Sequence, residues 1–482
     1  MANQVGVYQS ALKYYSEHWQ RADDFPEKEA LRVLSRLLGY KNGNFLSEVV
    51  HPGDRVVVKP NWVMDRHPSG MDVFSMITHS AVIRAVVDLA YEAMHSEGEI
   101  VIADAPQWDC DFDNLLRITQ IERIADYYRA KYGFHIPIRD LRQIRCVTQD
   151  GYIKAKDRIK LVGDPEGYAV VDLGEQSAFI GMPEIERLYG ADYDRQETIK
   201  HHNNRRHEYL VSKTILGTDV IINVPKLKVH KKVGVTVNAK GMVGINGNKN
   251  WVAHYRIGDP TIGGDEYPAS EAHLAKAKAR STHYLIDRLL TQDSVVLERV
   301  FNSIYGIYKR LKPLIDWWPD HRVSVDAGNW YGNDTAWRMT ADLALAVLYA
   351  DRDGQISHRM QRHFFSVVDG IMAGEKDGPL NPTPKPCGVI VAGDNLLMVD
   401  LVCTRLMGFD YRKTRSLRWL TESCPLPMGV DKPEQIRVRS NIPDWESLMT
   451  NPLAADLAFE PHQGWKGHIE LDGQRVRSGE MG

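Results

Sequence analysis

The chain has 482 residues, and its 60 lysines and arginines nearly balance its 63 aspartates and glutamates, which leaves a formal net charge of −3. This length exceeds one small domain, and the near-neutral balance argues against nucleic-acid binding through overall positive charge. The five cysteines are scattered without a C-x-x-C pair, which argues against an iron–sulfur cluster, a zinc ribbon or a disulfide framework.

The first residues lack an apolar core of signal-peptide type, and no run of about 18 apolar residues appears anywhere in the chain. We therefore expect a cytoplasmic protein that makes no membrane contact. Assembly into an oligomer stays open.

The first half of the chain predicts alternating strands and helices. Residues 1–50 are expected to form a peripheral helical extension. Asp111 or Asp113 is the expected N-cap of the helix that begins near residue 113. The core elements expected in this half are strands at 55–58, 99–103 and 220–224, and helices at 80–94 and from 113. This order predicts an α/β fold with a mostly parallel sheet and crossover helices.

The core is expected to span residues 51–410, interrupted by an irregular insertion at about 135–215 and a helical insertion at about 265–325. Its second half predicts helices at 335–350 and 396–407, strands at 364–369 and 389–392, and a turn at 373–379. Residues 411–482 are expected to form a C-terminal surface tail.

The segment from Pro225 to Lys240 alternates between apolar and polar residues, as a strand with two unlike faces does. The polar positions are Lys226, Lys228, His230, Lys232, Gly234, Thr236, Asn238 and Lys240. A strand with one wet face gives the same pattern. However, residues 220–258 contain no Asp or Glu, so an anion site is the alternative. The run is longer than an ordinary strand, and a break is expected near 231–234.

Polar residues follow the other predicted strands as well. In open α/β sheets, ligands bind at the carboxyl ends of strands. The residues expected there are Lys59, Asn61, Asp104, Gln107, residues 226–230 and Asp369. We therefore expect one composite site.

A glycine-rich loop at residues 241–250 follows the alternating segment, and its backbone N–H groups could approach an anion. It matches neither a Walker A loop nor a dinucleotide fingerprint, and an ordinary surface turn remains the alternative. The candidate ligand-binding residues in and after the loop are Asn246, Lys249, Asn250 and Arg256.

Several acidic residues lie in predicted turns, among them Asp369, Glu375, Asp394 and Asp400. Turns favour aspartate whatever the function. A divalent metal is nevertheless a candidate cofactor, with His254 and Glu375 as its candidate ligands. No H-x-x-x-H or similar spacing strengthens this hypothesis.

These segments together resemble the family called domain of unknown function 362, over roughly residues 50 to 410. The segments that carry the resemblance are Val58 to Asn61, Thr78-His79, Ala103 to Pro106, Ile222 to His230, Gly234 to Lys240, Asp369 to Glu375, Gly378-Pro379, Asp394 and Asp400. Many relatives carry ferredoxin-type cysteine motifs. This chain has none, so no iron–sulfur cluster is expected, and the family name implies no reaction.

A more distant similarity is to the nickel-dependent lactate racemases, which have a histidine and a lysine ten residues apart and a further histidine. His230, Lys240 and His254 are spaced similarly. In that family the lysine holds a nickel-pincer nucleotide, and histidines are metal ligands and proton donors. The chain departs from the pattern, since Val-Asn-Ala-Lys replaces Gly-Gly-Arg-Lys and the early Gly-Thr-His motif has no counterpart near Asp104.

Two hypotheses follow for function. In the first, the protein is an enzyme acting on a small carboxylate, sugar acid or phosphate by proton transfer or epimerisation. His230, Lys240, Asp104 and Asp369 would be catalytic. The residues that would bind the substrate are Lys59, Asn61, Lys226, Lys228, Thr236, Asn246, Lys249, Asn250 and Arg256. In the second, the same face binds an acidic or phosphorylated sugar without turnover, with Trp251 and Trp330 as candidate stacking residues.

Overall fold

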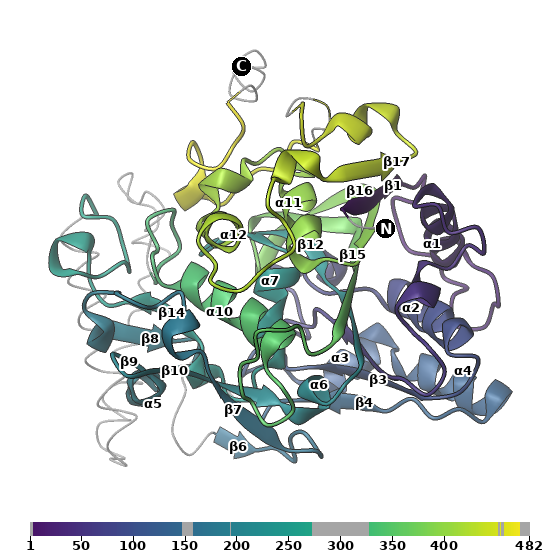
Figure 1. Cartoon of the computed structure of the whole chain (residues 1–482), viewed down its shortest axis with the longest axis horizontal. Coiled ribbons are helices and arrows are strands. Elements are labelled where there is room, and N and C mark those ends of the chain that lie inside the picture. The colour runs from purple at the N-terminus through teal and green to yellow at the C-terminus, as the bar shows by residue number, and fades with distance from the viewer. Residues whose placement is uncertain are drawn as a thin grey trace.

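The computed structural model describes residues 3–146, 158–192, 194–271, 327–451, 454 and 457–472. In this part of the chain a ten-stranded sheet forms the centre of the molecule (Figure 1). Its main path runs β17 (Arg437–Ser440), β1 (Gln4–Gln9), β16 (Asn381–Gly393), β15 (His363–Asp377), β11 (Val220–Val224), β2 (Arg55–Pro60), β3 (Glu99–Asp104) and β4 (Ile138–Asp140).

Most neighbouring strands of the main path run parallel, which confirms the predicted fold class. β11 pairs in parallel with β2 and β15, and β2, β3 and β4 continue the parallel order. Only β16 runs against its neighbours β1 and β15 among the described strands on this path. The parallel order puts the ends of β2, β3 and β11 at one edge of the sheet.

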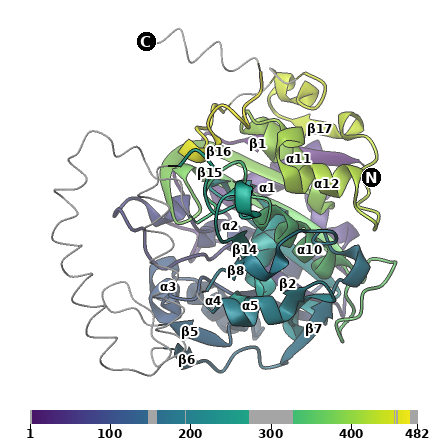
Figure 2. The same ribbon diagram turned by 90° about the vertical axis from the view of Figure 1, so that its left-hand side faces the viewer.

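Helices cover both faces of this sheet (Figures 1 and 2). Val56 and Val58 of β2 face a core built with α1 (Pro26–Leu37) and α2 (Ser80–Ala93). Val57 faces the opposite core, built with α10 (Ala336–Tyr349) and α11 (Leu396–Leu406). Because neighbouring strand residues point to opposite faces, an apolar run such as Val56–Val58 suits a strand buried on both sides.

Both ends of the chain differ from expectation. The N-terminal segment begins with β1, whose Val5 and Val7 are fully buried between β16 and β17. The C-terminal region supplies β17 and α12 (Arg415–Glu422). These segments belong to the sheet and its helical layer because their apolar side chains complete the same core.

The predicted turn at 373–379 is largely strand. β15 extends to Asp377 because it has a partner on each side, β16 along its length and β12 (Lys226–His230) beside its second half. Asp369 therefore lies within a strand, and Asp400 lies within α11 rather than in a turn. Asp111 is the N-cap of α3 (Phe112–Thr119), as one of the two expected candidates.

The region expected as an irregular insertion holds small sheets. Its strands are β5 (Ile144–Cys146), β6 (Arg158–Lys160), β7 (Tyr168–Asp172), β8 (Leu188–Gly190), β9 (His202–Asn203) and β10 (Arg206–Ser212). The helices not yet named are α4 (Glu122–Tyr132), α5 (Arg195–His201), α6 (Lys213–Leu216) and α7 (Asn238–Gly241). Most of the helical insertion expected at 265–325 lies outside the described residues.

A buried carboxyl joins α10 to the small sheets. Asp342 accepts hydrogen bonds from Ser177 Oγ at 2.6 Å, Ala178 N at 2.7 Å and Tyr209 Oη at 3.0 Å. Burial raises the pKa of Asp342 from 3.8 to about 7. The unfolded chain ionises this carboxyl at lower pH than the folded protein does. The Asp342 carboxyl therefore contributes fully to the stability of the fold at pH values below its pKa in the unfolded chain. This contribution is lost as pH rises through its pKa in the folded protein.

Replacing this carboxyl by an uncharged amide, Asp342→Asn, should destabilise the protein most at low pH. The unfolding temperature of the variant should fall further below wild type at about pH 5 than at about pH 8, because a folded-state pKa one unit above the unfolded value corresponds to about 1.4 kcal/mol. Asp353→Asn, at a carboxylate that is 81% exposed, is the control. A difference between Asp342→Asn and wild type that does not change with pH would contradict the assignment.

Candidate active site

The alternating segment forms an antiparallel hairpin of β12 and β13 (Gly234–Thr236), broken at residues 231–233 as expected. Lys228 lies opposite Thr236 and His230 lies opposite Gly234, so one face of the hairpin gathers polar groups. These side chains are buried, at 0% exposure for Lys228 and 3% for His230. The interpretation as a solvated strand face is therefore wrong.

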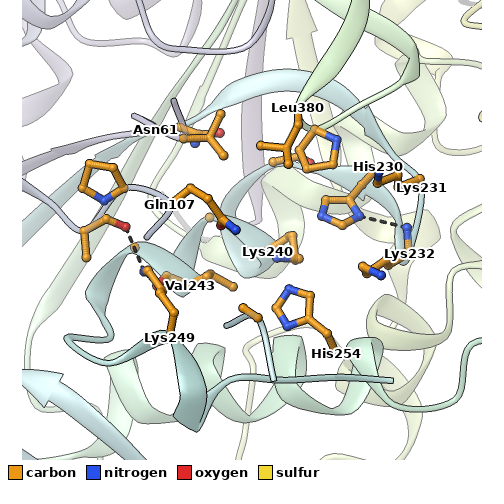
Figure 3. Close-up of a pocket in the computed structure, with 18 of the residues that line it drawn as sticks. Asn61, Gln107, His230, Lys231, Lys232, Lys240, Val243, Lys249, His254 and Leu380 are labelled. Carbon is orange, nitrogen blue, oxygen red and sulfur yellow. Dashed lines mark hydrogen bonds between the residues drawn. The ribbon is translucent and has the colours of Figure 1, made fainter. Parts of the chain in front are cut away.

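A cavity of about 250 Å³ lies against this face, at the carboxyl edge of β2 and β3 (Figure 3). Of all the candidate site residues named from the sequence, it is lined by Asn61, Asp104, Gln107, Lys228, His230, Thr236, Lys240, Lys249 and His254. Its size suits a small metabolite rather than a cofactor-sized ligand. The tertiary structure thus brings together groups from four separate parts of the chain.

Two histidines face this cavity with opposite tautomers. The Nδ1 atom of His230 accepts the backbone N–H of Lys232 at 3.0 Å, so the proton of the neutral ring is on Nε2. The Nδ1 atom of His254 lies 2.9 Å from the carbonyl oxygen of Val252 and must donate to it, which leaves a lone pair on Nε2. His230 therefore offers a donor and His254 an acceptor.

Burial keeps both rings neutral. Desolvation, followed by the nearby charge of Lys240, holds the pKa of His230 and that of His254 well below the usual 6.5. Neither Nε2 atom makes a hydrogen bond or ion pair within the described residues. The tautomers set by the backbone therefore persist at neutral pH.

Lys240 lies between the two imidazole rings in Figure 3. Its side chain projects from α7, and its Nζ atom makes no hydrogen bond or ion pair with any described residue. An ammonium ion buried without a counter-charge is unfavourable. Burial accordingly lowers the pKa of Lys240 from 10.5 to about 7, so a large fraction of the amine is unprotonated at neutral pH.

The position of α7 depends on a buried carboxyl in α11. Asp400 accepts the backbone N–H groups of Asn238 at 2.8 Å and Ala239 at 2.9 Å. The side-chain oxygen of Asn238 also accepts a hydrogen bond from Asn223 Nδ2 of β11 at 2.8 Å. Burial raises the pKa of Asp400 to about 7. These contacts hold the first turn of α7 against the sheet and so place Lys240 in the cavity.

The other cavity lysines differ from Lys240 in having partners. Lys228 Nζ donates to the Met76 carbonyl at 2.5 Å, and burial lowers the pKa of Lys228 well below 10.5. Lys249 Nζ donates to the carbonyl oxygens of Ala105 at 2.9 Å, Val243 at 2.8 Å and Asn246 at 3.3 Å. Burial also lowers the pKa of Lys249 to about 7. Carbonyl oxygens can accept from neutral amines, so neither lysine needs to remain charged.

Polar atoms of the cavity wall remain without partners. The side-chain atoms Asn61 Oδ1, Trp62 Nε1 and Thr236 Oγ1 are buried and make no hydrogen bond within the described chain. Buried polar atoms are normally hydrogen-bonded. Three such atoms in the wall of one cavity are what a polar ligand would satisfy.

An ion pair closes the floor of the cavity. Lys59 Nζ lies 2.9 Å from Asp104 Oδ1, and Asp104 Oδ2 accepts the Trp62 backbone N–H at 2.7 Å. Gly244 packs directly against this pair, since a Cβ at that position would lie 1.9 Å from Asp104 Oδ1. The close approach explains why the loop carries glycine here.

Lys226 and Asp369 form a separate buried ion pair outside the cavity lining. Lys226 Nζ lies 2.7 Å from Asp369 Oδ2 and donates to Tyr15 Oη at 2.7 Å. The strand register shifts between Lys226 and Lys228. Lys226 lies opposite Asp369 in the pairing of β12 with β15, and its amine pairs with that carboxylate and does not line the cavity as Lys228 does.

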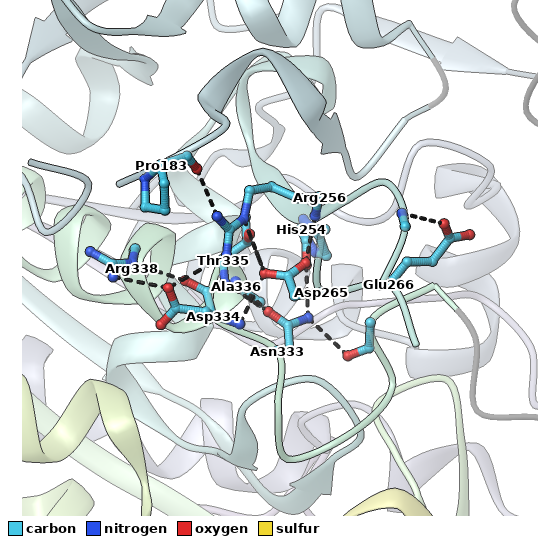
Figure 4. Close-up of polar contacts among 12 residues, drawn as sticks. Pro183, His254, Arg256, Asp265, Glu266, Asn333, Asp334, Thr335, Ala336 and Arg338 are labelled. Atoms are coloured by element: carbon cyan, nitrogen blue, oxygen red, sulfur yellow. Dashed lines mark hydrogen bonds and ion pairs between the residues drawn. The ribbon is translucent and has the colours of Figure 1, made fainter. Parts of the chain in front are cut away.

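Arg256 lies in a polar network rather than in the cavity lining (Figure 4). Its backbone N–H donates to Asp265 at 2.5 Å, and its guanidinium lies 3.6 Å from the carboxylates of Asp265 and Asp334. In the same network, Asn333 Nδ2 donates to the carbonyl oxygen of His254 at 3.0 Å. The network therefore holds β14 (Ala253–Arg256) and the His254 backbone in place.

The structure places the remaining predicted site residues elsewhere. Asn246 and Asn250 are buried in the loop, where Asn250 bonds to Asp192 and to the backbone of Asp194. Glu375 pairs with Lys385 at 2.9 Å and does not line the cavity that His254 faces. No group of three or more His, Cys, Asp or Glu side chains suited to a metal occurs among the described residues. In the described part of the chain, His254 and Glu375 therefore do not form the candidate metal site.

Two tyrosines that line the cavity were not among the site residues predicted from the sequence. The rings of Tyr189 and Tyr255 stack at 5.2 Å, and both line the cavity. Tyr189 lies on the three-residue strand β8, which carries no periodic signal. The two tryptophans considered as sugar platforms have other contacts, since Trp251 stacks on His201 at 3.3 Å and Trp330 Nε1 donates to Asp265 at 2.9 Å.

Residues 167–405 match the model of a family described as a domain of unknown function, DUF362. The match includes His230, Lys240 and His254 but does not reach Asn61 or Asp104. No curated protein matches the chain. The similarity to nickel-dependent lactate racemases stays a prediction.

A crystal structure of a protein from Thermotoga maritima resembles the chain at 11% sequence identity and a TM-score of 0.27. The resemblance covers 74% of this chain and 52% of that one, so the chain spans about half of that protein's length. A similarity this low carries no argument about fold or function. Within the described segments, no helix is long and apolar enough to cross a bilayer.

Adding a methyl group at Gly244 should disturb the floor of the cavity. In Gly244→Ala the new Cβ would displace the Lys59–Asp104 pair, and overpacking of this kind costs about 1–3 kcal/mol, which thermal unfolding would detect. Gly241→Ala is the matched control, because its Cβ would meet only Asn223 Nδ2, at 3.8 Å, in a helical backbone with φ of −61°. Equal stability of the two variants would contradict this packing.

Proposed function

We propose that this member of the DUF362 family is an enzyme that moves a proton at the carbon next to the carboxylate of a small anionic substrate. The arrangement of His230 and His254 around Lys240 is the observation that carries the proposal. A hydrogen-bond donor, an acceptor and an amine without a partner face one small cavity in the described part of the chain. Such a set suits acid–base chemistry.

In this proposal the roles follow from the protons that each group holds. His254 Nε2 and Lys240 Nζ, which have lone pairs, are the candidate bases. His230 Nε2 donates a hydrogen bond to the oxygen on which negative charge develops, as a neutral imidazole can. Abstracting the proton and returning it on the opposite face would epimerise the carbon.

The unpartnered atoms of Asn61, Trp62 and Thr236 would bind the polar groups of the substrate. The Lys228 amine would stabilise the carboxylate, since an anion beside it favours its charged form. Asp104 would act through Lys59 and Trp62 as a positioning residue. Arg256 and Asp265 would position His254 in the same indirect way.

Proton exchange into small hydroxy acids would test the reaction. In D₂O, the wild-type protein incubated with lactate, glycerate or gluconate should incorporate deuterium at the carbon next to the carboxylate, as seen by proton NMR. His254→Gln and Lys240→Met should each slow exchange by about 100-fold or more, since both remove a base. His363→Gln, at an exposed residue at the start of β15, is the control. Unchanged exchange in Lys240→Met would remove Lys240 from the mechanism.

The exchange rate should also depend on pH with a definite sign. Lys240 acts as a base only without its proton, and its pKa lies at about 7. At saturating substrate the rate should rise with pH and then level off, with a midpoint above about 7, because the bound anion raises the pKa of the amine. In Lys240→Met this limb should disappear from the pH profile. A rate that falls over the same range would exclude an unprotonated Lys240.

Binding of an anion should take up protons. An anion beside Lys228 or Lys249 raises the pKa of these amines, so the complex holds more protons than the free protein. Affinity should therefore decrease as pH rises from about 6 to about 8. Titration calorimetry with lactate in buffers of different ionisation enthalpy would measure the uptake. If neither the affinity nor the number of protons taken up on binding changes with pH, this prediction is wrong.

The second candidate is a protein that binds an acidic or phosphorylated sugar without turnover. The stacked Tyr189 and Tyr255 favour it, because aromatic side chains in a cavity wall can pack against a sugar ring. Incubation with mixtures of sugar acids and sugar phosphates, followed by mass spectrometry, distinguishes the two. Ligand recovered unchanged and without deuterium favours binding alone, whereas any product favours the enzyme.

A further inference from the structure

We infer that Lys240 captures a small 2-oxo acid as a covalent imine, with its Nζ atom as the nucleophile. This inference rests on the proposed function, because it assigns a substrate class and a covalent step to the same cavity. The Lys240 amine differs from the other lysine amines near the cavity in its contacts with the surrounding described residues.

Partners distinguish Lys240 from its neighbours. Lys59 and Lys226 pair with carboxylates, Lys228 and Lys249 donate to carbonyl oxygens, and Lys232 Nζ donates to the Ala327 carbonyl. Lys240 Nζ makes no such contact with the described residues. A lysine amine with no acceptor, desolvated near other amines, is the state in which lysine attacks carbonyl carbon.

The two histidines complete the chemistry. The Lys240 nitrogen would form a bond to the carbonyl carbon while the C=O π bond breaks, and His230 Nε2–H would donate a hydrogen bond to the resulting oxyanion. His254 Nε2 would accept the two amine protons in turn and pass each to that oxygen. The oxygen then leaves as water, so amine and ketone give imine and water with no other reactant.

The cavity suits a ketone that lies beside a carboxylate. Its volume of about 250 Å³ admits a small acid. Lys228 faces the cavity from β12, opposite Thr236, whose hydroxyl lacks a partner among the described residues. A carboxylate bound there would be held by groups other than Lys240, which leaves the Lys240 amine free to react. Protonation of the imine nitrogen would acidify C3, on the far side of the imine carbon from the carboxylate. This is a different atom from the carbon at which proton transfer in hydroxy acids is proposed.

Reductive trapping tests the inference. The full chain incubated with pyruvate and sodium cyanoborohydride should gain the mass of one reductively coupled pyruvate, and peptide mapping should place it on Lys240. Lys249 is an internal control, since burial lowers its pKa to the same value of about 7 while its Nζ donates to three carbonyls. Lys240→Met should lose the adduct while keeping the wild-type unfolding temperature.

Three results would overturn the inference: no adduct, an adduct on Lys249, or labelling spread over exposed lysines at the rate of a free lysine derivative. Deuterium exchange into hydroxy acids, measured on the same preparation, separates the two proposals. Exchange without an adduct would refute the imine and leave the proposed proton transfer standing. An adduct on Lys240 without exchange would support the imine and refute the proton transfer in hydroxy acids.

Discussion

The burial of basic side chains away from carboxylates is the constraint on which the site depends. Lys240 has no counter-charge among the described residues, and the carboxylates of Asp104 and Asp369 pair with Lys59 and Lys226 instead. Because charge without a partner is costly in a buried cavity, the amine and both imidazoles favour their neutral forms. A segment rich in lysine thus becomes a set of neutral bases.

The sheet provides the geometry that makes this burial possible. β15 is long enough to pair first with β11 and then with β12, so the chain after β11 remains inside the sheet. The β12–β13 hairpin then lies over the carboxyl ends of β2 and β3, where Asn61 and Asp104 are found. Asp400 and the network around Asp265 fix the two remaining segments, which carry Lys240 and His254.

Much of the core could be predicted because it depends on local signals. The apolar runs of β2, β3 and β11 and the N-cap at Asp111 are readable in the chain, and the break after His230 follows from the length of the run. β1 could not be assigned because Val5 and Val7 are its only aliphatic side chains, whereas β2, β3 and β11 have continuous apolar runs. The end of β15 was missed because its glycines are typical of turns, whereas pairing on both sides keeps them extended.

The sequence by itself determined that polar groups from β12 and β13 share a face, because side chains alternate in any extended strand. It also placed Asn61 and Asp104 at the same edge, since parallel strands end together. Only the tertiary structure decided which lysines have partners: the pairing of β12 with β15 places Lys226 opposite Asp369, and no acceptor approaches Lys240 among the described residues. Protonation depends on such contacts between distant segments, and spacing along the chain does not encode them.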